Sequence, residues 1–170
     1  MIEIRGIPCL VIDGLLEWCC IDLSPDWDQL TEIGEERNDQ KREFASTRQL
    51  TTNPHFDGIC GEWAYGMLYG IRPNVQLLVQ GDPNPDFSGV EVKTSSYWQD
   101  PWLRMFPDDR FNAQCFVLVA LNKPDRSARV WGWASPEEIQ NTAVEHIPGQ
   151  GFRHVLRTDQ LHKMEILNAK

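Results

Sequence analysis

Long apolar runs are missing from this chain of 170 residues. No run approaches the ~20 residues that a transmembrane helix needs. The start of the chain, Met-Ile-Glu-Ile-Arg-Gly, also lacks the basic stretch and the apolar run of a signal peptide. We therefore expect an intracellular, cytoplasmic protein that has no membrane partner.

Cysteine patterns typical of a disulfide framework or a zinc site are missing as well. The five cysteines are an odd number, Cys19 and Cys20 are adjacent, and no Cys-x-x-Cys pair occurs. We expect reduced and mostly buried thiols. His55 and Asp57 lie near Cys60, but no spacing supports a metal site or a Cys–His pair there.

Positive charge is scarce, and its distribution is uneven. The net charge is −9. Residues 1–62 hold 13 acidic and 5 basic side chains, whereas residues 63–170 hold 12 and 11. An acidic chain argues against tight binding of nucleic acid that is independent of the nucleotide sequence. The nearly neutral second part can still present a local basic face, and the acidic first part can bind a partner or mimic nucleic acid.

Repeats and linkers are absent, so we expect a single domain over residues 1–170. Asp13-Gly14 between apolar runs predicts a hairpin of Ile7–Ile12 and Leu15–Ile21, and Ser24-Pro25 predicts the start of a helix. The remaining expected elements are a helix over 57–70, strands over 75–79, 89–95, 115–121, 129–133 and 152–156, a helix over 136–144, and a short turn or helix from 158.

The rest of the chain is organised around residues 82–95. A turn-rich half with two prolines runs into an alternating half, which predicts a strand. One face would carry Val90, Val92 and Thr94, and the other would carry Glu91, Lys93 and Ser95. Asp86 lies just across the turn. Two acids and a lysine at one strand edge can hold a hard divalent cation and position a water. The alternative is a half-exposed strand with a surface Glu–Lys pair.

Two further segments carry candidate functional residues. Glu62 is the only charged side chain after Asp57 in the expected helix, and Gly66 one turn later leaves it room to point into a site. Residues 96–113 combine aromatic side chains with arginines and are interrupted by prolines. Such a loop can stack on bases and clamp phosphates, or it can pack its aromatics on its own domain. The candidate nucleic-acid-binding residues are Ser95, Trp98, Trp102, Arg104 and Arg110.

The order of these features resembles the PD-(D/E)xK nuclease superfamily. The motif stands here as Pro85-Asp86 followed by Glu91-Val92-Lys93, and Glu62 matches the acid that many members carry on the first core helix. The resemblance covers roughly residues 57–145. The short length and the Gly132-Trp133 strand end are similar to small phage-encoded members. The gap between Asp86 and Glu91 is shorter than in many members, so Asp82 is an alternative ligand.

The resemblance implies an α/β (α+β) fold with a restriction-endonuclease-like core, in which helices flank a central mixed β-sheet. Residues 1–50 would add an N-terminal hairpin and helix, and residues 146–170 a C-terminal strand and turn or helix. It implies a Mg²⁺- or Mn²⁺-dependent nuclease that hydrolyses phosphodiester bonds, with DNA favoured as the partner and a homodimer as one arrangement. The implied metal ligands are Asp86, Glu91, the Val92 carbonyl and Glu62. Lys93 would orient and help to deprotonate the attacking water or stabilise charge on the phosphate. A non-catalytic acidic binding or inhibitor protein on the same fold is the alternative.

Overall fold

The computed structural model describes residues 1–42, 54–80 and 84–164. Asp82, the alternative ligand, lies outside these residues. The main strands are β1 (Ile2–Ile4), β2 (Ile7–Ile12), β3 (Leu15–Asp22), β4 (Val90–Ser95), β6 (Cys115–Asn122) and β7 (Ser127–Ala134). A smaller sheet holds β5 (Leu103–Met105), β8 (Val144–Ile147) and β9 (Gly151–Leu156). The α-helices are α1 (Trp27–Arg42), α2 (Pro54–Tyr69), α3 (Val75–Gln80) and α4 (Pro136–Gln140).

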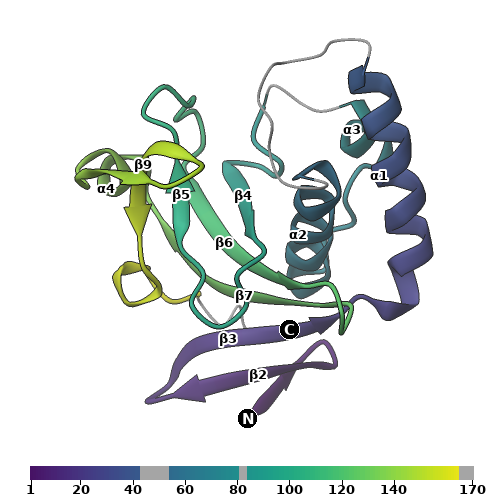
Figure 1. Ribbon diagram of the computed structural model, residues 1–170. Helices are drawn as coiled ribbons and strands as arrows, with labels where there is room; N and C mark the ends of the chain where they lie inside the picture. The colour runs from purple at the N-terminus through teal and green to yellow at the C-terminus, as the bar shows by residue number, and fades with distance from the viewer. Residues whose placement is uncertain (43–53, 81–83, 165–170) are drawn as a thin grey trace.

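A mixed six-stranded sheet in the order β1-β2-β3-β7-β6-β4 forms the centre of the molecule. Among the described strands of this sheet, β4 and β6 run parallel and the other neighbours are antiparallel. Helices α1, α2 and α3 lie on one side of it, and the smaller sheet and α4 lie on the other (Figure 1). The expected mixed sheet flanked by helices is therefore confirmed. The N-terminal hairpin joins this sheet because β3 pairs with β7.

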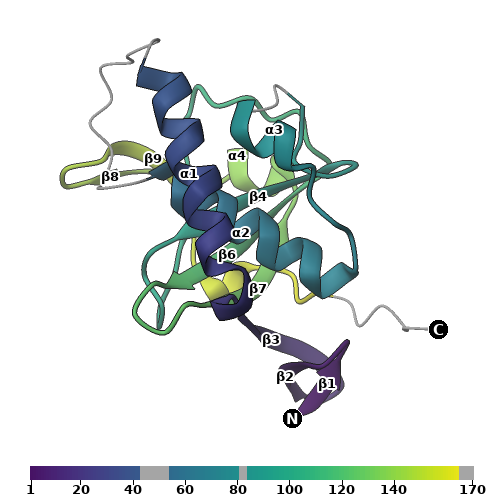
Figure 2. The same ribbon diagram turned by 90° about the vertical axis from the view of Figure 1, so that its right-hand side faces the viewer.

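Strand β6 is buried on both faces, which explains why its sequence is an unbroken apolar run rather than an alternating one. Val117, Val119 and Leu121 belong to the core beneath the helices. Phe116 and Leu118 belong to a second core on the other face, shared with β5, β9 and α4. The sheet thus separates two apolar layers. Strand β4 is an edge strand of this sheet, and α1 crosses in front of the sheet in the view of Figure 2.

The hairpin of β2 and β3 forms as predicted, but the expectation of reduced thiols is wrong for two cysteines. Cys9 and Cys19 form a disulfide and are fully buried. The two-residue turn pairs Ile12 with Leu15, and the register then shifts by one between Leu10 and Val11. This bulge sets Cys9 opposite Cys19, whose Cα atoms are 4.1 Å apart.

The expected strand over 75–79 is wrong, because these residues form helix α3. A short apolar run fits a strand and a buried helix turn equally well. Asn74 decides between them, because its side-chain oxygen accepts hydrogen bonds from the Gln76 and Leu77 amides at 3.0 and 3.3 Å, as an N-cap does. Helix α4 is also shorter than expected, since it ends at Gln140 and the chain continues into β8.

Candidate functional site

Helix α2 presents Glu62 toward β4 because the two elements approach closely at Gly61. A Cβ at this glycine would collide with the Thr94 hydroxyl on β4. Glycine therefore lets the helix backbone pack against the strand. Gly66 does not provide the predicted room for Glu62, because the space at Gly66 is taken by the Ile71 carbonyl and the Pro73 ring.

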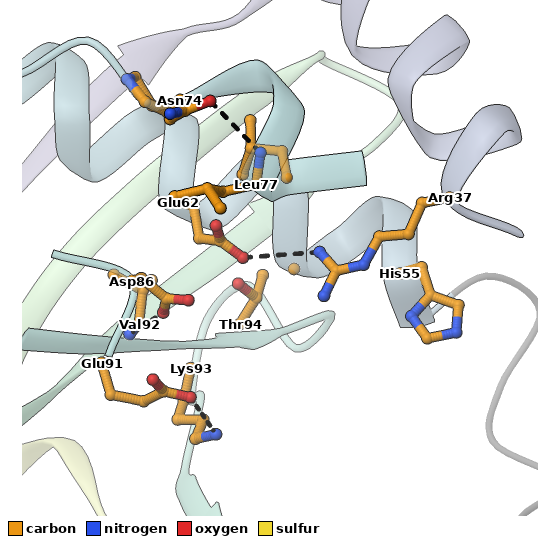
Figure 3. Close-up of a pocket in the computed structure, with 13 residues that line it drawn as sticks. Arg37, His55, Glu62, Asn74, Leu77, Asp86, Glu91, Val92, Lys93 and Thr94 are labelled. Carbon is orange, nitrogen blue, oxygen red and sulfur yellow. Dashed lines mark hydrogen bonds and ion pairs between the residues drawn. The ribbon is translucent and has the colours of Figure 1, made fainter. Parts of the chain in front are cut away.

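A cavity of about 410 Å³ opens between α2, α3 and β4, and we call it the acidic cavity. The side chains that matter for its chemistry are Arg37, Glu62, Asp86, Glu91, Lys93 and Thr94 (Figure 3). Three of these are carboxylates and two are cations. The structure thus brings all four predicted catalytic residues to one cavity, although Glu62 comes from α2 and the other three come from residues 86–93.

Two carboxyl groups in the acidic cavity are poorly compensated. Burial, and the charges of Asp86 and Glu91, raise the pKa of Glu62 to about 8, although Arg37 opposes this. Burial and the charge of Glu91 raise the pKa of Asp86 to about 7, although the Val92 N–H opposes this. Both groups carry a fraction of protonated carboxylic acid near neutral pH. Such a pair favours a proton or a cation between its members.

The partners of the four predicted residues are specific. Asp86 Oδ2 accepts a hydrogen bond of 2.7 Å from the Val92 amide. Glu62 Oε1 lies 3.8 Å from Arg37 Nη1. Glu91 Oε1 lies 2.9 Å from Lys93 Nζ. The contact of Asp86 is with a backbone amide, and the ion pair of Glu62 is long at 3.8 Å.

The predicted two faces of β4 are confirmed, and this divides the candidate site. Val92 packs into the core beneath the helices, whereas Lys93 Nζ lies 6.0 Å from the Phe116 ring centre on the opposite side of the sheet. Glu62 reaches the cavity from the helix side, and Glu91 from the other (Figure 3). Within residues 1–42, 54–80 and 84–164, no three His, Cys, Asp or Glu side chains gather into a ready-made metal site.

Sequence reasoning missed one charged residue of the site. Arg37 lies on a long polar stretch of α1. Its guanidinium turns toward α2, and its side chain is only 16% exposed. His55 also lines the cavity, whereas the neighbouring Cys60 is buried, and burial raises its thiol pKa to about 12. Cys60 is therefore a packed thiol and not a nucleophile.

Three of the five predicted nucleic-acid-binding residues line one cavity, and the other two lie elsewhere. Ser95, Trp102 and Arg104 line a second cavity next to the acidic one. Trp98 instead packs on the central sheet, with its ring centre 4.2 Å from the Arg129 guanidinium. Arg110 is exposed and lines neither cavity.

Comparison of the chain with protein-family models, curated proteins and solved structures finds no match. No helix among the described residues is both long enough and apolar enough to cross a membrane.

Proposed function

We propose that this protein is a metal-dependent nuclease that hydrolyses phosphodiester bonds, with an endonuclease acting on DNA as the favoured form. The observation that carries the proposal is the acidic cavity. Two largely buried carboxyl groups with raised pKa values, Glu62 and Asp86, face the same space as Glu91 and Lys93. The proposal agrees with the resemblance of Asp86, Glu91 and Lys93 to the PD-(D/E)xK motif.

The donor chemistry of the acidic cavity fits Mg²⁺ or Mn²⁺ better than a cation that needs a closed protein cage. Mg²⁺ usually binds one or two carboxylates together with waters and substrate phosphates. Glu62 and Asp86 supply two such groups, and Glu91 and the Val92 carbonyl would complete the set from β4. When bound, such a cation lowers the pKa of a water and neutralises charge on the phosphate.

The cationic side chains have separable roles in this proposal. Lys93 lies between the acidic cavity and its neighbour, because it lines both. Its ammonium would stabilise negative charge that develops on the phosphate and orient the attacking water. Arg37 opposes the rise in the pKa of Glu62 and would offer a second cation to the substrate. Glu91 fixes Lys93 through their 2.9 Å contact.

The test is a cleavage assay with Mg²⁺ and with Mn²⁺ on plasmid, linear, single-stranded and branched DNA, and on RNA. Wild type is compared with Glu91→Ala and Lys93→Ala, and with Glu36→Gln as an exposed acidic control on α1. We expect cleavage by wild type and control, and a loss of at least ~100-fold in the site variants, since general acid–base groups contribute about 10²–10⁴-fold. The proposal fails if no substrate is cut with either metal, or if the site variants cut as fast as wild type.

The acidic binding or inhibitor protein makes a different prediction for the same variants. Such a protein would cut nothing and would bind its partner equally well after Glu91→Ala. Circular dichroism on each variant separates both outcomes from loss of the fold.

A further inference from the structure

A second cavity of about 430 Å³ lies beside the acidic cavity, between β4, the loop that follows it, and the smaller sheet. We call it the arginine cavity. It shares Lys93 and Thr94 with the acidic cavity, so the two are adjacent. Its volume lies within the range of about 300–1,000 Å³ that is common for small-molecule pockets.

Arg104 is held in a fixed position in the arginine cavity. Its guanidinium carbon lies 5.0 Å from the Tyr97 ring centre and 4.9 Å from the Trp102 ring centre. One terminal nitrogen donates to Gln150 Oε1 at 3.1 Å. The Nε atom is buried and has no hydrogen-bond partner among the described residues. Arginine clamped between aromatic rings loses little conformational freedom when it binds a phosphate.

The charge of the arginine cavity is opposite to that of its neighbour. Its cations are Lys93, Arg104 and Arg153, and its acids are Asp57 and Asp109. Asp57 forms an ion pair of 2.6 Å with Lys123, and Asp109 accepts a 2.8 Å hydrogen bond from the Phe106 amide. A positive cavity thus adjoins a negative one, and Lys93 stands at their common wall.

Tyr97 offers an open aromatic surface at this cavity. The residue is 55% exposed, although Arg104 packs against its ring. A large exposed aromatic beside a positive cavity is suited to stack a base whose phosphate is bound by the arginine. A base inside a duplex cannot stack this way, because its neighbours already cover both of its faces.

We propose that the arginine cavity binds one unpaired nucleotide of a single-stranded nucleic-acid segment, with its base on Tyr97 and its phosphate at Arg104. The proposal rests on the proposed nuclease function, because it places this nucleotide next to the bond that would be cut in the acidic cavity. DNA and RNA strands share the base and phosphate chemistry that these residues recognise. The substrate is therefore a single strand, an overhang or a frayed end rather than an intact duplex.

The test is binding measured by fluorescence anisotropy in EDTA, so that no cleavage takes place. The probes are labelled oligonucleotides of about 12 nucleotides, within the usual site size for single strands: single-stranded DNA, single-stranded RNA, and the blunt DNA duplex. Wild type is compared with Tyr97→Ala, Arg104→Ala and Arg104→Lys. Lys163→Gln is the control, because it removes one positive charge at the distant ion pair with Glu17.

We expect wild type to bind a single strand at least ~10-fold more tightly than the duplex. Loss of one base–aromatic stack should weaken binding by about 5- to 150-fold in Tyr97→Ala. Arg104→Ala should weaken it similarly, and Arg104→Lys should recover only part of the loss, because lysine keeps the charge without the planar fork. The control should bind as wild type does. The DNA and RNA arms identify the sugar.

The proposal is overturned if the duplex binds as tightly as the single strands, or if Tyr97→Ala and Arg104→Ala bind as wild type does. Cleavage assays run in parallel separate it from the proposed function. A protein that shows the expected binding but cuts nothing keeps the arginine cavity and loses the nuclease. A protein that cuts with Mg²⁺ but whose variants bind normally keeps the nuclease and loses the arginine cavity.

Discussion

Replacing Glu62 by glutamine should stabilise the folded protein at alkaline pH and have little effect at acidic pH. Glu62 has a pKa raised to about 8 from its ordinary value of 4.5, first because it is buried and then because Asp86 lies nearby. In the unfolded chain the same carboxyl group is ionised at any pH above its ordinary pKa of 4.5. Between the two values the folded protein binds more protons than the unfolded one, so its free energy of unfolding falls as pH rises.

The size of this effect follows from the two pKa values. One pKa unit corresponds to about 1.4 kcal/mol. The difference between 4.5 and about 8 therefore lowers the free energy of unfolding of wild type by at most roughly 5 kcal/mol, at pH values above the folded-state pKa. Relaxation of the site and its coupling to Asp86 reduce this. We expect Glu62→Gln to gain about 2–4 kcal/mol over wild type at about pH 9, and less than about 1 kcal/mol at about pH 5. Arg37 loses its partner in the variant, which also limits the gain.

Urea unfolding followed by tryptophan fluorescence measures this free energy at both pH values. Glu36→Gln serves as the matched control, because it removes an exposed carboxylate from neighbouring α1. It should follow the wild-type pH profile within about 0.5 kcal/mol, as surface substitutions usually do. If Glu62→Gln also runs parallel to wild type across the range, Glu62 is not buried among uncompensated negative charges. The acidic cavity would then not hold poorly compensated carboxylates.

Two further outcomes follow from the same region. Mg²⁺ or Mn²⁺ should raise the urea midpoint of unfolding more at about pH 8.5 than at about pH 5.5. Protons compete with the cation for carboxyl groups whose pKa values lie near 7 and 8. Equal shifts at both pH values would contradict binding at these groups. Gly61→Ala should destabilise the protein by about 1–3 kcal/mol, because its Cβ collides with the Thr94 hydroxyl. Adding Thr94→Ala should recover most of that loss, since this hydroxyl is buried and has no hydrogen-bond partner among the described residues. A double variant that is no more stable than Gly61→Ala alone would show that the collision is not the cause.

The elements that sequence reasoning predicted correctly are those with local signals. Asp13-Gly14 determines a two-residue turn, and both residues adopt positive φ, as this turn type requires. The alternation from Val90 to Ser95 placed Val92 toward the core and Lys93 on the opposite face. In each case a few adjacent residues carry the information.

The parts that were missed depend on contacts between distant segments or on a one-residue shift. The Cys9–Cys19 disulfide needs the bulge in the hairpin, since a regular register after Asp13-Gly14 would set Cys9 opposite Trp18. Arg37 belongs to a polar stretch of α1 without a local signal for a site, and the packing of α1 on α2 brings it to Glu62. Burial of the Glu62 carboxylate likewise arises from tertiary packing.

The candidate acids came from the motif, but their arrangement did not. The sequence placed Asp86 and Glu91 at one strand edge. It did not indicate that Glu62 and Glu91 approach the acidic cavity from opposite faces of β4 (Figure 3). This arrangement follows from the position of α2 on the sheet. That position depends on contacts between residues that are far apart in the sequence.

The hydrogen bond between Asp86 and the Val92 amide also has a consequence for self-association. Strand β4 is the last strand of the six-stranded sheet and pairs only with β6 among the described strands. The outward amides of an edge strand can recruit a strand from another molecule and so promote aggregation. The Asp86 carboxylate occupies one of these amides, at 2.7 Å. The same side chain that serves the proposed chemistry therefore also covers part of an open sheet edge.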